Sequence, residues 1–182
     1  MNVLFIVGSA RKESITMELC KAAASSIYDA EVKFIRPHEM HIDHCTGCRK
    51  CRDGACVIDD DMSAIHDAAE KSDMIIFATP VYFSGPTSII KQVADRFQSI
   101  WEQNGYKGTK SRTAALICVG GRDRPVFSGV IPVFKALAMT IGAAWAGELT
   151  IGGTDKMKEL PDRILEEAQK FGDAVSRAHR GS

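Results

Sequence analysis

The feature that most constrains the fold of this chain is the alternation of short apolar segments with longer amphipathic ones. Strand-like apolar patterns occur at residues 3–7, 31–36, 73–78, 112–119 and 143–151. Helical patterns lie between and after them, the first following Ser14 and the others at residues 63–71, 88–98, 130–139 and 160–178. Strands that alternate with helices need crossover connections, which favour a mostly parallel sheet with helices on both faces. The sequence therefore predicts an α/β fold.

We expect a three-layer sandwich around a five-stranded parallel sheet in the order 2-1-3-4-5. Ligands of such sheets bind beyond the carboxyl ends of the strands, at the point where the strand order reverses. The site is therefore expected in the loops after Val7, Ala78 and Val119. A length of 182 residues predicts a single domain. The long irregular stretch at about residues 37–60 is expected to be a cysteine-rich insertion loop.

The charge balance excludes some classes of partner. Lys and Arg total 23, and so do Asp and Glu, so no overall field draws the protein to nucleic acid or to a membrane surface. No 18 apolar residues run together, and the N-terminus lacks the basic flank and cleavage site of a secretory signal. We expect a cytoplasmic protein whose partners are small molecules or other proteins, with no role for nucleic acid or membrane.

The first loop, residues 8–16, has the composition of a monophosphate site. It offers the hydroxyls of Ser9, Ser14 and Thr16, the cationic side chain of Arg11, and N–H groups at the start of a helix. It lacks the glycine pattern of dinucleotide folds and the G-K-[ST] ending of triphosphatase loops, which disfavours ATP and a tightly held NAD. The alternative is an ordinary polar loop with a helix cap.

The second loop, residues 79–86, places two aromatic side chains in a stiff turn. Its two prolines restrict the backbone and Gly85 permits the turn, so Tyr82 and Phe83 are able to lie against a flat heterocycle. The alternative is a tight turn with two core aromatics. The third loop, residues 119–122, contains two glycines that allow a ligand to approach the main chain.

Four cysteines form a compact motif, C-x2-C-x2-C-x4-C, at Cys45, Cys48, Cys51 and Cys56. Four thiolates with such spacings are able to hold a four-iron, four-sulfur cluster, and the cationic residues between them would offset its negative charge. The alternatives are a structural zinc ion, a redox-active dithiol and free thiols. The spacing departs from that of zinc ribbons, in which two cysteine pairs stand farther apart.

Other candidate residues favour ordinary roles. Cys20 and Cys118 lie in apolar segments and are expected to be buried as small apolar side chains. Exposed loop positions are expected for His38, His41 and His44, although these could join a metal site. Three aromatic residues could pack in the core, line the opening above a ligand or form a subunit contact: Trp101, Tyr106 and Phe127.

The segments GSARKESIT, ATPVYFSGPTSIIKQVADR and CVGG resemble those of the NADPH-dependent FMN reductase family, which has a flavodoxin-like fold. The likeness covers about residues 2–151. It implies that the family's phosphate loop corresponds to Ser9, Arg11, Ser14, Ile15 and Thr16. It implies that the isoalloxazine loop corresponds to Pro80, Val81, Tyr82, Phe83, Ser84 and Gly85, with Gly121 as a third contact. The segment CTGCRKCRDGAC is similar to the iron-sulfur flavoprotein branch, in which four thiolates hold a four-iron, four-sulfur cluster close to FMN.

The resemblance implies an FMN-dependent oxidoreductase of the NAD(P)H-dependent FMN or quinone reductase type. NAD(P)H would be the co-substrate, a quinone, flavin or azo compound the acceptor, and a ferredoxin a further partner if the cluster is present. It also implies a homodimer or homotetramer. No acid-base constellation is found, and none is needed because the flavin supplies the hydride chemistry. The alternatives are a cluster-free quinone or azo reductase, a flavin-binding redox sensor, and a flavodoxin-like electron carrier, which the neutral charge disfavours.

Overall fold

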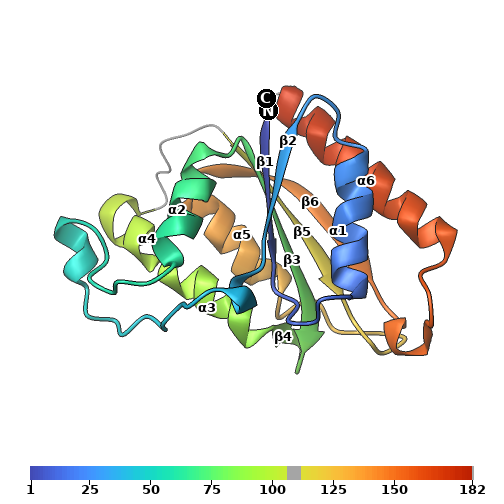
Figure 1. Cartoon of the computed structure of the whole chain (residues 1–182), viewed down its shortest axis with the longest axis horizontal. Coiled ribbons are helices and arrows are strands. Elements are labelled where there is room, and N and C mark those ends of the chain that lie inside the picture. Colours follow the sequence, from blue (N-terminus) through green and yellow to red (C-terminus); the bar gives the residue numbers. More distant parts are fainter. Residues whose placement is uncertain (106–111, 182) are drawn as a thin grey trace.

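Five long parallel strands form the centre of the structure, a computed structural model that describes residues 1–105 and 112–181 (Figure 1). These strands are β1 (Asn2–Val7), β2 (Glu31–Ile35), β3 (Met74–Tyr82), β5 (Arg112–Val119) and β6 (Ala143–Ile151). They lie in the order β2-β1-β3-β5-β6. This confirms the predicted order 2-1-3-4-5, because β4 (Gly85–Pro86) is a two-residue strand that pairs only with β3, antiparallel to it.

Helices cover both faces of the sheet and complete the three layers. On one face lie α1 (Ile15–Ser25) and α6 (Asp162–Arg180), which pack against each other (Figure 1). On the other side lie α2 (Met62–Lys71), α3 (Ser88–Arg96), α4 (Gln98–Asn104) and α5 (Ile131–Thr140). Short 3-10 helices occur at Pro37–Glu39, Lys50–Asp53 and Thr154–Lys156. Within the described ranges, no helix is both long and apolar enough to span a membrane.

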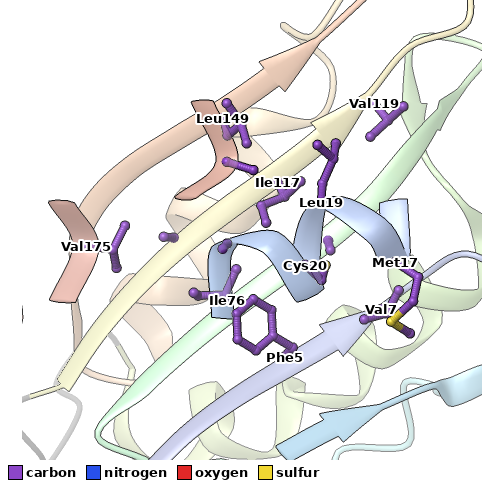
Figure 2. Packing of buried hydrophobic residues seen from close by; sticks show 14 of the residues in the cluster. Phe5, Val7, Met17, Leu19, Cys20, Ile76, Ile117, Val119, Leu149 and Val175 are labelled. Atoms are coloured by element: carbon purple, nitrogen blue, oxygen red, sulfur yellow. The ribbon is translucent and has the colours of Figure 1, made fainter. Parts of the chain in front are cut away.

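The sheet buries side chains on both of its faces, which explains why the strands read as continuous apolar runs. In β1, Val3, Phe5 and Val7 join the core beneath α1 and α6, whereas Leu4 and Ile6 join the core on the opposite face. Figure 2 shows the first of these cores, with side chains of α1 packed onto β1, β3 and β5. The two cores hold the strands in register, and so fix where their carboxyl ends meet.

The two isolated cysteines are buried, as predicted. Cys20 lies in the core beneath α1, and Cys118 lies in the core on the opposite face. Burial raises the pKa of the Cys118 thiol to about 12, and it raises the pKa of Cys20 further. Both thiols therefore stay protonated at neutral pH and act as small apolar side chains.

Two elements differ from the expected ones by more than a small shift of their ends. The expected strand at residues 73–78 continues to Tyr82, because β3 keeps pairing with β5 as far as Pro80 and Val119 and then folds back onto β4. The expected helix at residues 88–98 ends at Arg96, and α4 follows as a separate helix. At this break the N–H of Phe97 is shared between two carbonyl oxygens of the preceding turn, and its ring is buried.

Candidate functional site

The three loops selected from the sequence line one cavity of about 720 Å³ at the carboxyl edge of the sheet. Its walls include Ser9, Arg11, Ser14, Ile15, Thr16, Pro80, Val81, Tyr82, Phe83, Ser84 and Gly121. Gly85 is the predicted residue that does not line it, since this glycine lies in β4 opposite Tyr82. The volume lies in the range of sites for small molecules and cofactors, roughly 300 to 1,000 Å³.

The first loop joins β1 to α1 and presents groups suited to an anion. Ser14 is the N-cap of α1, with an extended backbone and a hydroxyl that accepts a hydrogen bond of 3.2 Å from the N–H of Met17. The next two residues, Ile15 and Thr16, open the helix and line the cavity. N–H groups of a first helical turn have no intrahelical partner, and the helix dipole is positive there. With the exposed Arg11 beside them, these groups match a phosphate.

The second loop is a β-hairpin whose turn strains the backbone. Tyr82 pairs with Gly85, and the two residues between them, Phe83 and Ser84, have φ values of 50° and 63°. Such values suit the type I′ turn of tight hairpins, but they are costly for a bulky aromatic residue. The expected tight turn is present, yet Phe83 and Tyr82 are exposed rather than part of the core. The two residues form an exposed rim of the cavity, where aromatic side chains suit contact with a flat ligand.

The third wall is larger than the sequence predicted. Beyond Gly121, the cavity is lined by Val119, Gly120, Arg122, Arg124, Pro125, Val126, Thr154 and Asp155. The turn after β6 reaches this wall because the N–H of Asp155 donates 3.0 Å to the carbonyl oxygen of Gly121. A Cβ on Gly121 would lie 2.3 Å from the Asp155 carboxylate, so no larger residue is accommodated without displacing it. The glycine pair after the fifth predicted strand was the available signal for this turn.

The four cysteines lie around a second hollow, of about 710 Å³, between their own loop and helices α3 and α4. The outer part of the loop is fastened to α4. Glu102 forms ion pairs with Arg49 and Arg52, and the side-chain amide of Gln103 donates hydrogen bonds of 2.9 and 2.6 Å to the carbonyl oxygens of Cys51 and Gly54. The carboxylate and amide side chains of one helix therefore hold the segment that carries the motif.

The cysteine side chains are free thiols, of which Cys45 and Cys48 are exposed and Cys51 and Cys56 are half-buried. Hydrogen bonds from the Lys50 N–H and from the Thr46 side chain lower the pKa of Cys48, whereas burial raises the pKa of Cys51. No three His, Cys, Asp or Glu side chains within residues 1–105 and 112–181 are grouped closely enough to hold a metal ion. Four thiolates among cationic side chains suit an iron-sulfur cluster or zinc in their chemistry, and a shared ligand would need them drawn together.

The remaining sequence candidates take minor positions. The three loop histidines, His38, His41 and His44, are exposed as expected, and His44 lies at the second hollow. Phe127 packs partly against the core, and Trp101 is exposed on α4; neither is among the residues that line either hollow. Tyr106 lies outside the described residues.

The sequence matches that of known proteins over most of its length. The family model described as NADPH-dependent FMN reductase matches residues 1–152. An iron-sulfur flavoprotein of Archaeoglobus fulgidus is 28% identical over 181 residues, which cover 98% of this chain and 80% of that protein. An iron-sulfur flavoprotein of Methanocaldococcus jannaschii is 35% identical over 123 residues, or 66% of this chain and 62% of that protein.

Solved structures share the fold at lower identity. A flavone reductase superposes with a TM-score of 0.75 and 23% identity, and the match covers 99% of this chain but 63% of that one. An azoreductase of Bacillus anthracis gives a TM-score of 0.69 at 12% identity, covering 97% of this chain and 99% of that one. A WrbA-like flavodoxin of Agrobacterium tumefaciens gives a TM-score of 0.63. With its flavodoxin-like fold, the chain belongs to the NADPH-dependent FMN reductase family of flavin oxidoreductases.

Proposed function

We propose that this protein is an NAD(P)H-dependent FMN or quinone reductase that binds FMN in the first cavity and a four-iron, four-sulfur cluster at the second hollow. The observation that carries the proposal is the convergence of three strand-end loops on one cavity of about 720 Å³. These are the loops expected to bind a ligand in a doubly wound sheet. The family match supports FMN as that ligand.

The loop between β1 and α1 would hold the FMN phosphate. The hydroxyls of Ser9, Ser14 and Thr16 would donate to its oxygens, and Arg11 would offset its charge. Ile15 would contribute its backbone N–H at the first turn of α1. Because Ser9 and Thr16 are buried, the polar end of the cavity is pre-formed rather than assembled around the ligand.

The hairpin and the glycine loop would hold the isoalloxazine ring between them. Backbone and side-chain groups of residues 80–84 line the cavity on one side, while the glycine loop with Gly121 would face the ring from another. Gly85 would act indirectly, by pairing with Tyr82 to shape the turn. When bound, FMN supplies the hydride and one-electron chemistry, and the protein supplies binding and orientation. The exposed rim of Tyr82 and Phe83 leaves room for a flat nicotinamide or quinone to approach.

The cysteine loop would supply the cluster ligands Cys45, Cys48, Cys51 and Cys56. The iron-sulfur flavoproteins among the relatives support this assignment. Arg49 and Arg52 at the outer part of the loop would offset negative charge on the bound group. A ferredoxin-like protein would then be a suitable one-electron partner, alongside small acceptors such as quinones and flavins.

A second candidate is a cluster-free NAD(P)H quinone or azo reductase, in which the cysteine loop shapes a substrate pocket. The arrangement of the thiols favours it, because within the described ranges no three candidate ligands are grouped around one point. The loop would then remain a set of free thiols of unequal acidity.

The test is the absorbance spectrum, flavin content, iron content and sulfide content of protein purified and reconstituted without oxygen. Stoichiometric FMN with about four irons per chain would support the cluster assignment. Stoichiometric FMN without iron would leave the cluster-free reductase. Turnover of NADPH and NADH with a quinone separates an enzyme from an electron carrier, and protein without flavin would contradict both candidates.

A further inference from the structure

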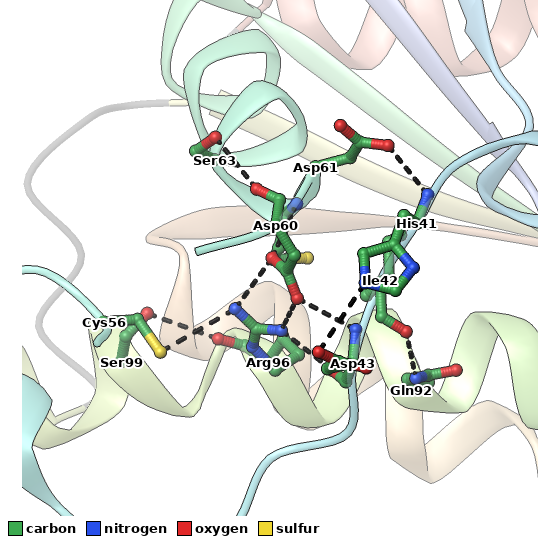
Figure 3. Close-up of polar contacts among 11 residues, drawn as sticks. His41, Ile42, Asp43, Cys56, Asp60, Asp61, Ser63, Gln92, Arg96 and Ser99 are labelled. Atoms are coloured by element: carbon green, nitrogen blue, oxygen red, sulfur yellow. Dashed lines mark hydrogen bonds and ion pairs between the residues drawn. The ribbon is translucent and has the colours of Figure 1, made fainter. Parts of the chain in front are cut away.

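The cysteine loop is closed at its base by a buried arginine. Arg96 is the last residue of α3, and its side chain is 2% exposed. Its guanidinium forms an ion pair with Asp60, donates 2.8 Å from Nη1 to the carbonyl oxygen of Asp43, and donates 3.7 Å from Nη2 to Sγ of Cys56 (Figure 3). One side chain on a helix therefore contacts the two residues that flank the cysteine-bearing segment, Asp43 and Asp60, and one thiol of that segment.

Asp60 completes the connection between the two ends. Its side chain is fully buried and accepts hydrogen bonds of 2.8 and 3.0 Å from the N–H groups of Asp43 and Met62. The next residue, Asp61, exchanges two further hydrogen bonds with the main chain of His41 (Figure 3). Residues 41–43 thus run beside residues 60–62, and the segment between them leaves and re-enters the fold at one place.

Stability alone does not account for a charge pair in this position. Replacing a buried ion pair by apolar residues of similar size is often neutral or stabilising, because removing two charges from water costs as much as their attraction returns. The fork of an arginine, in contrast, is able to fix several acceptors in one rigid geometry. Arg96 uses this property on a carboxylate, a carbonyl and a thiol.

We propose that Arg96 is a positioning residue for the iron-sulfur cluster: held by Asp60, it fixes both ends of the cysteine loop and presents an N–H to the sulfur of Cys56. The proposal rests on the proposed function in taking Cys56 as a cluster ligand. Partners of metal ligands orient them, and their loss commonly costs about 10- to 100-fold in metal affinity. An N–H donor to a ligand sulfur also stabilises the more reduced cluster, and so raises its reduction potential.

The test compares two variants of the full chain with the wild type. Arg96→Lys keeps the positive charge but loses the fork. The double variant Arg96→Met with Asp60→Asn removes both charges, so that no unpaired charge stays buried, and it keeps an amide oxygen to accept from the backbone N–H groups at this position. We expect both to lose the cluster to a chelator at a concentration about ten-fold lower than the wild type does. We also expect a lower cluster potential and an unchanged FMN content.

Arg112→Lys is the matched control. The Arg112 side chain is also buried, at 4% exposure, and it also joins a backbone carbonyl and a carboxylate, those of Ala69 and Glu70. It lines neither hollow. This variant should lose stability as Arg96→Lys does, while cluster retention and potential stay at wild-type values. Equal cluster retention and potential in Arg96→Lys and Arg112→Lys would overturn the proposal.

Protease cleavage within residues 43–60 of the iron-free, FMN-loaded protein separates this proposal from the cluster assignment itself. Wild-type protein without iron after reconstitution would contradict the cluster, and the position of the loop would remain measurable. Faster cleavage in Arg96→Lys than in Arg112→Lys would support the positioning role. Equal cleavage rates would contradict it.

Discussion

The hydroxyl of Thr87 donates a buried hydrogen bond of 2.7 Å to the carbonyl oxygen of Gly8. This contact joins the residue that follows the aromatic hairpin to the residue that begins the phosphate loop. The N–H of Thr87 is itself bonded to the hydroxyl of Thr79, at 3.2 Å. Two walls of the first cavity are therefore held to each other by one threonine, independently of any ligand.

Replacing Thr87 by valine should damage both stability and flavin binding. The Gly8 carbonyl loses its side-chain donor, and leaving a buried polar group without its partner costs about 1 to 3 kcal/mol of unfolding free energy. We expect a drop of that size in denaturant unfolding and weaker FMN binding in a fluorescence titration. Thr140→Val is the control, because the Thr140 hydroxyl donates within α5, to the carbonyl oxygen of Ala136. Equal FMN affinity in Thr87→Val and Thr140→Val would contradict a role of the Thr87–Gly8 hydrogen bond in FMN binding.

Ser14 should show separable roles in the helix and in the ligand site. Ser14→Ala removes the N-cap and should lower the unfolding free energy by about 1 kcal/mol. Ser14→Asp keeps a capping oxygen, so stability should stay near that of the wild type, but its negative charge would repel a phosphate. We expect Ser14→Asp to bind FMN less tightly than Ser14→Ala, measured by titration of the apoprotein. The reverse order would argue against a phosphate at this loop.

The positive φ of Phe83 should lower the unfolding free energy of the protein. Its φ of 50° is unfavourable for an aromatic residue by about 1 to 2 kcal/mol, and its exposed ring regains little by burial. Phe83→Asn suits the same backbone and should raise the unfolding free energy by about 1 kcal/mol. Quinone turnover should fall, because the flat rim of the cavity is lost. A less stable variant would show that the ring contributes contacts that offset the strain.

Low pH should weaken the contacts that Asp60 makes at the two ends of the cysteine loop. Burial raises the pKa of Asp60, but hydrogen bonds from Arg96 and from two backbone N–H groups outweigh it and hold the pKa below its ordinary value. A lowered folded-state pKa gives stability that is complete above the unfolded value, about 3.9, and is lost as the pH falls below it. The difference in unfolding free energy between wild type and Asp60→Asn should be constant above pH ~5 and shrink below pH ~4. A difference that stays constant at all pH values would show that the charge of the Asp60 carboxylate does not contribute to stability.

Much of the sheet was predictable from sequence because the central strands β1, β3 and β5 are buried on both faces and read as apolar runs. The strand at residues 112–119 and the one at residues 143–151 have the predicted bounds. The order 2-1-3-4-5 was expected as the flavodoxin-like arrangement, with which the alternation and right-handed crossovers are compatible, and the sheet has it. The first phosphate-type loop was identifiable because Ser14 carries both the cap signal and the polar chemistry.

What the sequence did not predict depends on contacts between distant segments. Pro80 indicates a loop, yet β3 runs through it because β5 supplies a partner up to Val119. The glycine pair at residues 152–153 indicates a turn after β6, but no local pattern places Asp155 against Gly121 at the cavity. The bonds that Arg96 makes 53 and 36 residues away likewise have no sequence signature. The cysteine spacing indicates that four thiols are available as metal ligands, but it does not indicate how far apart the loop holds them.

Helix α3 is bonded to the phosphate loop at one end and to the cysteine loop at the other. Thr87, its N-cap, bonds to the phosphate loop, and Arg96, its last residue, bonds to the cysteine loop. A helix rises 1.5 Å per residue, so these two attachment points are about 14 Å apart along a rigid rod. Helix α3 therefore acts as a spacer of fixed length. Insertions in the cysteine loop would change the loop's own path, while the separation between its anchor and the flavin cavity would stay the same.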